Sequence, residues 1–157
     1  MKLLPVVLVA GSLVFCLQSQ AAEKGKLTSI QGIAAATEAK LKTAGVNSTD
    51  ELLKKGASPK GREELAAKSG ISAAQILKFV NYADLMRIKG IGGQTAELLQ
   101  AAGVDTVAEL AKRNASNLGV KLSEVNDAKK LTGKVPPEKQ LAEWIEAAKT
   151  LLKKVTY

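Results

Sequence analysis

The sequence predicts an all-α protein, and three observations support this fold class. Alanine, leucine, lysine and glutamate dominate, and runs of β-branched residues are absent after the N-terminal segment. Glycine, proline, serine and asparagine interrupt the chain at short intervals, as they do between helices. A segment of twenty-six residues, 30–55, recurs fifty-eight residues later without a gap and with eleven identical positions. This duplication predicts a compact helical domain with pseudo-twofold symmetry, not a long repeat array.

The first element is a predicted signal peptide over residues 1–21. Lys2 precedes an uncharged apolar run, 3–17, and small residues at Ser19 and Ala21 suit a cleavage site. The run is shorter than the about 20 residues that a membrane span needs. Cleavage is therefore favoured over an uncleaved anchor, and we expect little association with the membrane afterwards.

The composition of the remaining chain suits a bacterial protein that is periplasmic or secreted. The only cysteine, Cys16, lies in the leader, and Phe15 before it argues against lipidation. A mature chain without disulfides is common among periplasmic proteins. The net charge of the full chain is +8, which favours polyanionic partners such as nucleic acid.

Residues 23–157 are expected to form a single all-α domain, beginning with the first copy at about 27–56. In this copy a helix is expected over 34–44, with Gly45 as its C-terminal cap. Ser48 or Thr49 then caps a short helix that runs through Lys55.

Two linker helices are expected over residues 59–81. Pro59 suits the start of a helix through Lys68 that stops at Gly70. Ser72 caps the next helix, which is expected to run from Ala73 to about Asn81. The pair also looks like a helix-turn-helix, but its second helix offers few base-reading residues near its start, so a linker role is favoured.

The second copy covers about 82–113, with a helix over 93–102, a stop at Gly103, a cap at Asp105 or Thr106 and a helix through Arg113. Residues 114–154 add C-terminal helices: one or two within 114–130 and, after Pro136 and Pro137, an amphipathic helix over 138–154. Trp144 lies on the apolar face of this last helix and is expected to pack in the core.

Each copy places a glycine turn, Ile-x-Gly-Ile, immediately before a helix. Ile88–Gly93 with Leu98 and Leu99 resembles the helix-hairpin-helix motif of DNA-repair, recombination and DNA-uptake proteins. The first copy departs from this motif, because Ala34 and Ala35 replace Gly92 and Gly93. The continuation from Val104 to Leu110 is similar to the extended form in recombinase N-terminal domains.

Nearly the whole mature chain also resembles a bacterial exported family of unknown function that is built on tandem helix-hairpin-helix units. The resemblance rests on residues 62–65, 70–72, 84–88 and 144–149. It implies a tandem helix-hairpin-helix fold and no particular activity.

The glycine turns are candidate sites for nucleic-acid phosphate. A positive φ at glycine is expected to turn successive N–H groups outward at the start of a helix, where the dipole favours an anion. The candidate phosphate-binding residues are Lys89, Gly90, Ile91, Gly92, Gly93, Thr95, Gly32, Ile33, Ala34, Lys40, Lys112 and Arg113. The alternative is that the turns only pack helices together, and the first copy is expected to do mainly this. Recurrence of a basic pair at Lys54-Lys55 and Lys112-Arg113 favours one shared binding face.

Enzymatic chemistry has little support in the sequence. Histidine is absent, the mature chain lacks cysteine, and no carboxylate pair suggests an acid–base site, so we expect no catalytic residue, metal or cofactor. We therefore expect a non-enzymatic module that binds double-stranded DNA without sequence preference. The rival is a protein-interaction or scaffold domain with an unknown partner. A weaker option is contact of the basic C-terminal helix with an anionic membrane.

Overall fold

The computed structural model describes residues 25–157, and all regular structure within them is helical, which confirms the predicted fold class. The elements are η1 (Leu27–Ser29), α2 (Ala35–Thr43), α3 (Thr49–Gly56), α4 (Pro59–Ser69), α5 (Ala73–Leu85), α6 (Gly93–Ala101), α7 (Val107–Leu110), α8 (Ala115–Lys129) and α9 (Glu138–Thr150). None of the helices in this part of the chain is long and apolar enough to cross a membrane. The predicted signal peptide, 1–21, lies outside the described residues.

Side-chain caps set where most of the helices begin. A side-chain oxygen of the residue before the helix accepts a hydrogen bond from the backbone N–H three positions later. The capping residues are Ser48, Ser58, Ser72, Thr106 and Asn114. The predicted region 114–130 therefore forms one helix, α8, with Asn114 as its cap.

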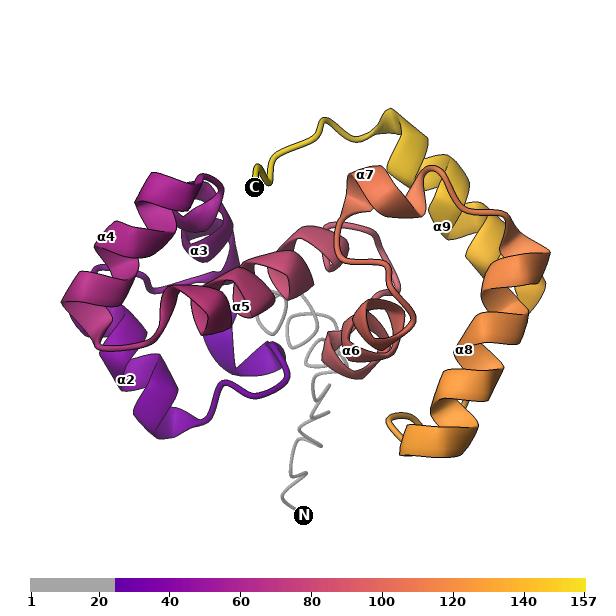
Figure 1. Ribbon diagram of the computed structural model, residues 1–157, viewed down its shortest axis with the longest axis horizontal. Helices are drawn as coiled ribbons and strands as arrows, with labels where there is room; N and C mark the ends of the chain where they lie inside the picture. Colours follow the sequence, from indigo (N-terminus) through magenta and orange to yellow (C-terminus); the bar gives the residue numbers. More distant parts are fainter. Residues whose placement is uncertain (1–24) are drawn as a thin grey trace, which may run out of the picture.

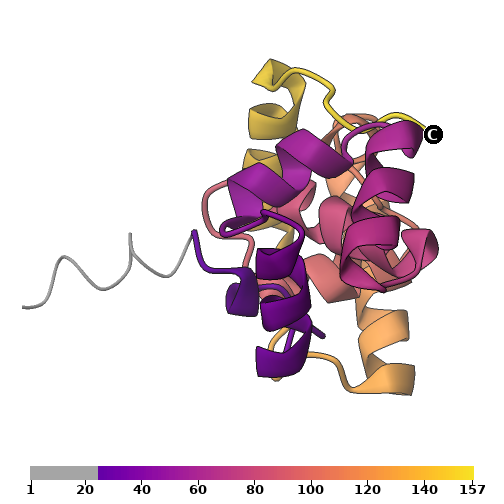
Figure 2. The same cartoon turned by 90° about the vertical axis from the view of Figure 1, so that its left-hand side faces the viewer.

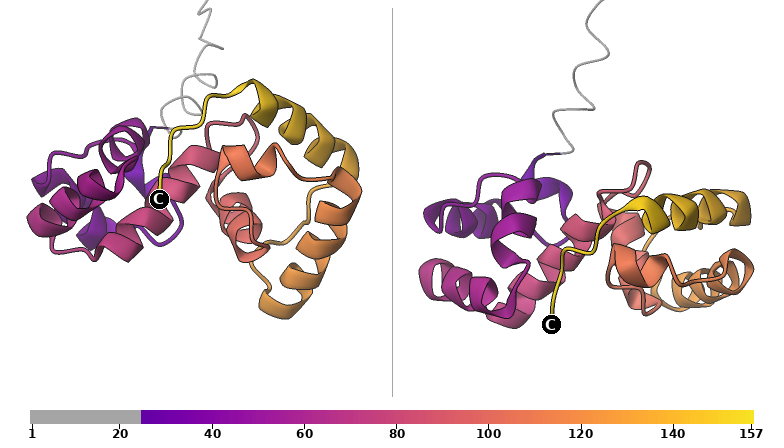
Figure 3. Two further views of the ribbon diagram at one scale, coloured as in Figure 1. Left: turned by 45° about the horizontal axis from the view of Figure 1, so that its top comes forward. Right: turned by 90° about the horizontal axis from the view of Figure 1, so that it is seen from above.

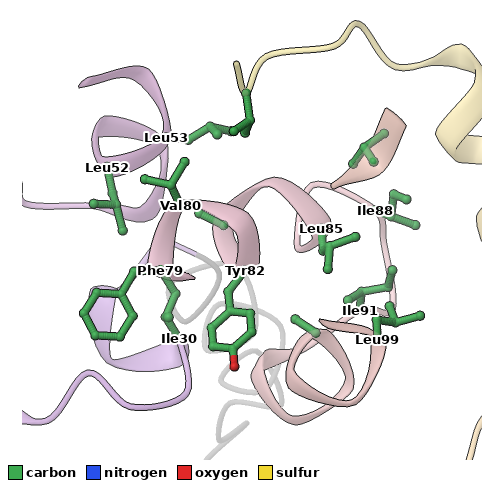
Figure 4. Close-up of a cluster of buried hydrophobic side chains, with 14 of the residues drawn as sticks. Ile30, Leu52, Leu53, Phe79, Val80, Tyr82, Leu85, Ile88, Ile91 and Leu99 are labelled. Atoms are coloured by element: carbon green, nitrogen blue, oxygen red, sulfur yellow. The ribbon is translucent and has the colours of Figure 1, made fainter. Parts of the chain in front are cut away.

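Helix α5 lies at the centre of the molecule, with α2, α3 and α4 on one side and α6–α9 on the other (Figure 1). The sequence predicted an end near Asn81, but α5 continues to Leu85 because its last turn is buried. A helix that is buried on all sides has no apolar stripe to mark its end. In Figure 4 the core continues past Tyr82 of α5, from Leu52 and Phe79 to Ile91 and Leu99.

The two halves of the molecule share one arrangement of helices. In the first half α4 packs on α2, and both α3 and α4 pack on α5, seen from the side of α2–α4 in Figure 2. In the second half α8 packs on α6, and both α7 and α8 pack on α9. Helix α9 therefore takes the place of α5. The buried residues Ile76, Phe79, Val80 and Ala83 of α5 correspond to Leu141, Trp144, Ile145 and Ala148 of α9.

The C-terminal segment, residues 151–157, leaves α9 and returns across the molecule to the first half (Figure 3). The predicted helix over 138–154 is therefore too long, since α9 ends at Thr150. Val155 is buried, and the N–H of Thr156 donates to the carbonyl of Ala57 at 2.9 Å. The extended segment brings Val155 into the core and Thr156 to Ala57, whereas a longer helix would carry both residues away from the first half.

Two arginines fasten this segment to the rest of the chain. The buried guanidinium of Arg62 donates to the carbonyls of Gly56, Ala57 and Thr156 at 3.0, 3.1 and 2.8 Å. Arg87 donates to the carbonyl of Leu152 at 3.0 Å. The C-terminal segment thereby joins the two halves, in addition to the contact of α5 with α6.

Burial of Tyr82 predicts a loss of stability in alkaline solution. Burial first, and then the carboxylates of Glu97 and Asp105, raise the pKa of Tyr82 from 10.0 to about 12. Between these two values the unfolded chain releases the proton while the folded chain keeps it, so the free energy of unfolding falls as pH rises. The full chain has two tyrosines, so Tyr157→Phe leaves tyrosinate absorbance to report on Tyr82 alone. Ionisation of Tyr82 in that variant near pH 10, without unfolding of the protein, would contradict this prediction.

Candidate functional site

The two glycine turns have the same backbone geometry. The φ angles of Gly32 and Gly90 are +89° and +96°, as the predicted turns require. The N–H of Ile33 donates to the carbonyl of Ile30 at 3.1 Å, and Ile91 donates to Ile88 at 3.2 Å. The alanines of the first copy therefore leave its turn unchanged in form. These bonds also correct one prediction, because the N–H groups of Ile33 and Ile91 close the turns and do not face outward.

An aromatic side chain packs behind each turn. A Cβ atom added at Gly32 would lie 3.5 Å from Phe79, and one added at Gly90 would lie 3.2 Å from the indole nitrogen of Trp144. Trp144 is buried, so the prediction that it packs in the core is confirmed. Close packing and a positive φ together account for glycine at both positions.

The structure places the two turns directly against each other. A Cβ atom at Gly93 would overlap the carbonyl oxygen of Ser29 and would lie 3.2 Å from the nitrogen of Gln31. The start of α6 thus lies on the backbone of the first turn. We call residues 31–34 and 89–93 the paired-turn surface. Its exposed residues are Gln31, Gly32, Ala34, Lys89, Gly90 and Gly92.

Helices α2 and α6 both begin at this surface without a side-chain cap. Their N-cap residues, Ala34 and Gly92, offer no side-chain acceptor, unlike the five capped helices; α9, which follows Pro137, also lacks a cap. The N–H groups of the first turn of a helix have no partner within that helix. The paired-turn surface therefore combines two sets of donors with the positive ends of two helix dipoles. Lys89 is exposed and forms no ion pair within residues 25–157.

The recurring basic pairs lie away from this surface. Lys55 donates to the carbonyl of Gly45, and Arg113 makes the equivalent bond to Gly103. These cations therefore stabilise the C-terminal ends of α2 and α6, where the dipole favours positive charge. The 9 residues of α6 separate Arg113 from the second turn by about 13 Å.

Of two other candidate phosphate-binding residues, Lys40 lies away from the turns and Thr95 is less exposed. Lys40 lies in the last turn of α2. Thr95, in the first turn of α6, is only partly exposed. The structure thus brings together the two turns and Lys89, but not Lys40, Lys112 and Arg113.

The recurrence also includes the second helix cap within each copy. Glu51 and Glu109 each accept a backbone hydrogen bond from the residue four positions earlier, at 2.7 and 2.8 Å.

No group of three or more acidic, histidine or cysteine residues suited to a metal ion occurs in the described part of the chain. Small side chains at most of its exposed positions leave the paired-turn surface formed mainly by backbone.

Comparison with known proteins identifies the family of this chain and nothing narrower. No curated protein and no solved structure matches it significantly. A family match covers residues 31–151, which include both turns and helices α2 to α9. The chain therefore belongs to the family described as a domain of unknown function, DUF4332.

Proposed function

We propose that the paired-turn surface binds the phosphate backbone of double-stranded DNA without sequence preference. The observation that carries this proposal is the contact between Gly93 and Ser29, because it sets the uncapped start of α6 against the first turn, which leads into the uncapped start of α2. We interpret the two turns as a pair of helix-hairpin-helix units. Each unit would contact one strand through backbone N–H groups.

Small residues at the surface favour close approach of a phosphate. Gly32, Ala34, Gly90 and Gly92 are exposed and carry at most a methyl group, so nothing bulky covers the helix starts. Lys89 adds a cation beside the second turn. Such contacts hold a protein on a duplex without reading bases. With the predicted signal peptide, they would place DNA binding outside the cytoplasm, in DNA uptake or on extracellular DNA.

Aspartate at the two empty cap positions provides a direct test. Ala34 and Gly92 have extended backbone, with φ −86° and −97°, and a Cβ atom at Gly92 would meet nothing within 4 Å. Ala34→Asp should raise the free energy of unfolding by about 1 kcal/mol, since aspartate is a favoured N-cap and alanine is not. Gly92→Asp should raise it by only a few tenths of a kcal/mol, since glycine is itself a tolerated N-cap. The new carboxylate should occupy the same N–H groups and repel phosphate. We expect affinity for duplex DNA to fall about tenfold in each variant, or by about 1.4 kcal/mol.

The measurement is fluorescence anisotropy with two unrelated duplexes at low and physiological salt. Ser58→Asp is the matched control, because it makes the same change of charge at the N-cap of α4. Wild-type affinity should be equal for both duplexes and should weaken with salt. Equal DNA binding by Gly92→Asp, Ser58→Asp and the wild type would show that the turns serve packing alone. The rival scaffold role would then be favoured.

A further inference from the structure

A basic cleft of about 300 Å³ lies in the second half of the molecule, away from the glycine turns. It is formed by the C-terminal end of α6, the turn after α7 and the start of α8. Three cationic side chains line it, those of Lys112, Arg113 and Lys121, together with the amides of Asn114 and Asn117. Ala102 and Leu118 complete the lining.

The cleft lies at the point where the two copies diverge. Helix α3 of the first copy continues to Gly56, whereas α7 ends at Leu110, before the predicted end at Arg113. A single turn follows, in which Lys112 N–H donates to the Glu109 carbonyl at 3.1 Å. Asn114 then caps α8. This early end of α7 places two successive basic residues on a turn beside α8.

The charges of the cleft are available to a ligand. None of its lining residues carries a carboxylate. One nitrogen of Arg113 is fixed by the carbonyl of Gly103, which leaves its other N–H groups. Lys121 pairs with Glu124 at 3.3 Å, but both side chains are more than half exposed, so water screens this pair and it holds Lys121 weakly.

We propose that this cleft binds a phosphate or pyrophosphate group. The three cations supply the charge and the asparagine amides supply neutral donors, which suits an anion with several oxygens. The N-terminus of α8, a helix of 15 residues, places the positive end of its helix dipole beside the same cleft, where it favours an anion. The volume is at the lower end of the range for ligand pockets, as a compact anion requires. The group belongs either to a free phosphorylated molecule or to a nucleic acid.

The test uses sodium pyrophosphate and the full mature chain at physiological salt. Binding is followed by calorimetry and by the amide NMR signals of Asn114 and Asn117. We expect saturable binding with shifts at these two signals. The double variant Lys112→Gln with Lys121→Gln should lose at least tenfold in affinity. Lys68→Gln with Lys139→Gln removes the same charge at exposed positions outside the cleft and should bind as the wild type does.

Competition with duplex DNA distinguishes the two sources of phosphate. If the cleft takes nucleic acid, pyrophosphate should displace the duplex and the double variant should weaken duplex binding. If it takes a free molecule, pyrophosphate should bind without changing duplex affinity. Absence of saturable binding, or equal loss in both double variants, would overturn the proposal. Gly92→Asp should retain pyrophosphate affinity, so this site and the paired-turn surface can fail separately.

Discussion

Replacement of Asp84 by alanine is expected to lower the free energy of unfolding by about 3–5 kcal/mol. The side chain of Asp84 is 2% exposed, and its two oxygens have different partners. One accepts from Arg87 at 2.7 Å, and the other accepts from the N–H of Val107, the first residue of α7, at 2.9 Å. Removal of the carboxylate leaves a partly buried guanidinium without its counterion and the buried N–H of Val107 without an acceptor.

Urea denaturation followed by circular dichroism measures this effect. Asp84→Asn keeps an acceptor and the shape of the side chain, so it should lose less stability than Asp84→Ala. Asp127→Ala is the control, because its carboxylate is 82% exposed and lies 3.7 Å from Lys130. The control should change stability by about 0.5 kcal/mol or less. A loss below about 1 kcal/mol in Asp84→Ala would show that α7 does not depend on this carboxylate.

Substitution of Gly93 by alanine is expected to cost about 3 kcal/mol, because the new methyl group would overlap the carbonyl oxygen of Ser29. The methyl group is fixed directly on Cα and the carbonyl of Ser29 belongs to the backbone, so neither can rotate aside as a long side chain would. Relief requires the start of α6 to move away from the first turn. The same movement would change the spacing of the two turns, so Gly93→Ala should also weaken the proposed binding of DNA.

Gly92→Ala is the matched control for this change, since a Cβ atom there meets nothing within 4 Å. Its stability should stay within about 0.5 kcal/mol of the wild type. Thermal and urea unfolding of both variants measure the difference. If the two variants are equally stable, the close contact between the turns does not exist in solution.

Much of the local structure could be predicted from the sequence, because it depends on neighbours along the chain. The stops at Gly45 and Gly103 and the caps at Ser48 and Thr106 use bonds between residues at most five positions apart. The ends of α5, α7 and α9 were predicted wrongly for the opposite reason. Burial of residues 82–85 and the partners of residues 151–157 depend on distant segments.

The candidate site also combines features that depend on local sequence with features that depend on distant residues. The positive φ of each turn glycine follows from local residues and is as predicted, whereas the inward N–H groups of Ile33 and Ile91 were not predicted. The basic pairs were misplaced because Lys55 and Arg113 bond to glycine carbonyls ten residues earlier, at the far ends of the helices. The correspondence of Phe79 with Trp144 lies outside the ungapped recurrence, so that recurrence did not show it.

The sequence by itself determined an all-helical chain, two equivalent turns and most of the helix starts. These features arise from backbone propensity and hydrogen bonds within a few residues, which a short segment specifies alone. Only the tertiary structure decided that the turns abut at Gly93, that α9 repeats the role of α5, and that residues 151–157 join the two halves. Each of these depends on the burial of side chains or backbone contributed by distant parts of the chain, and packing of that kind exists only once the whole core has formed.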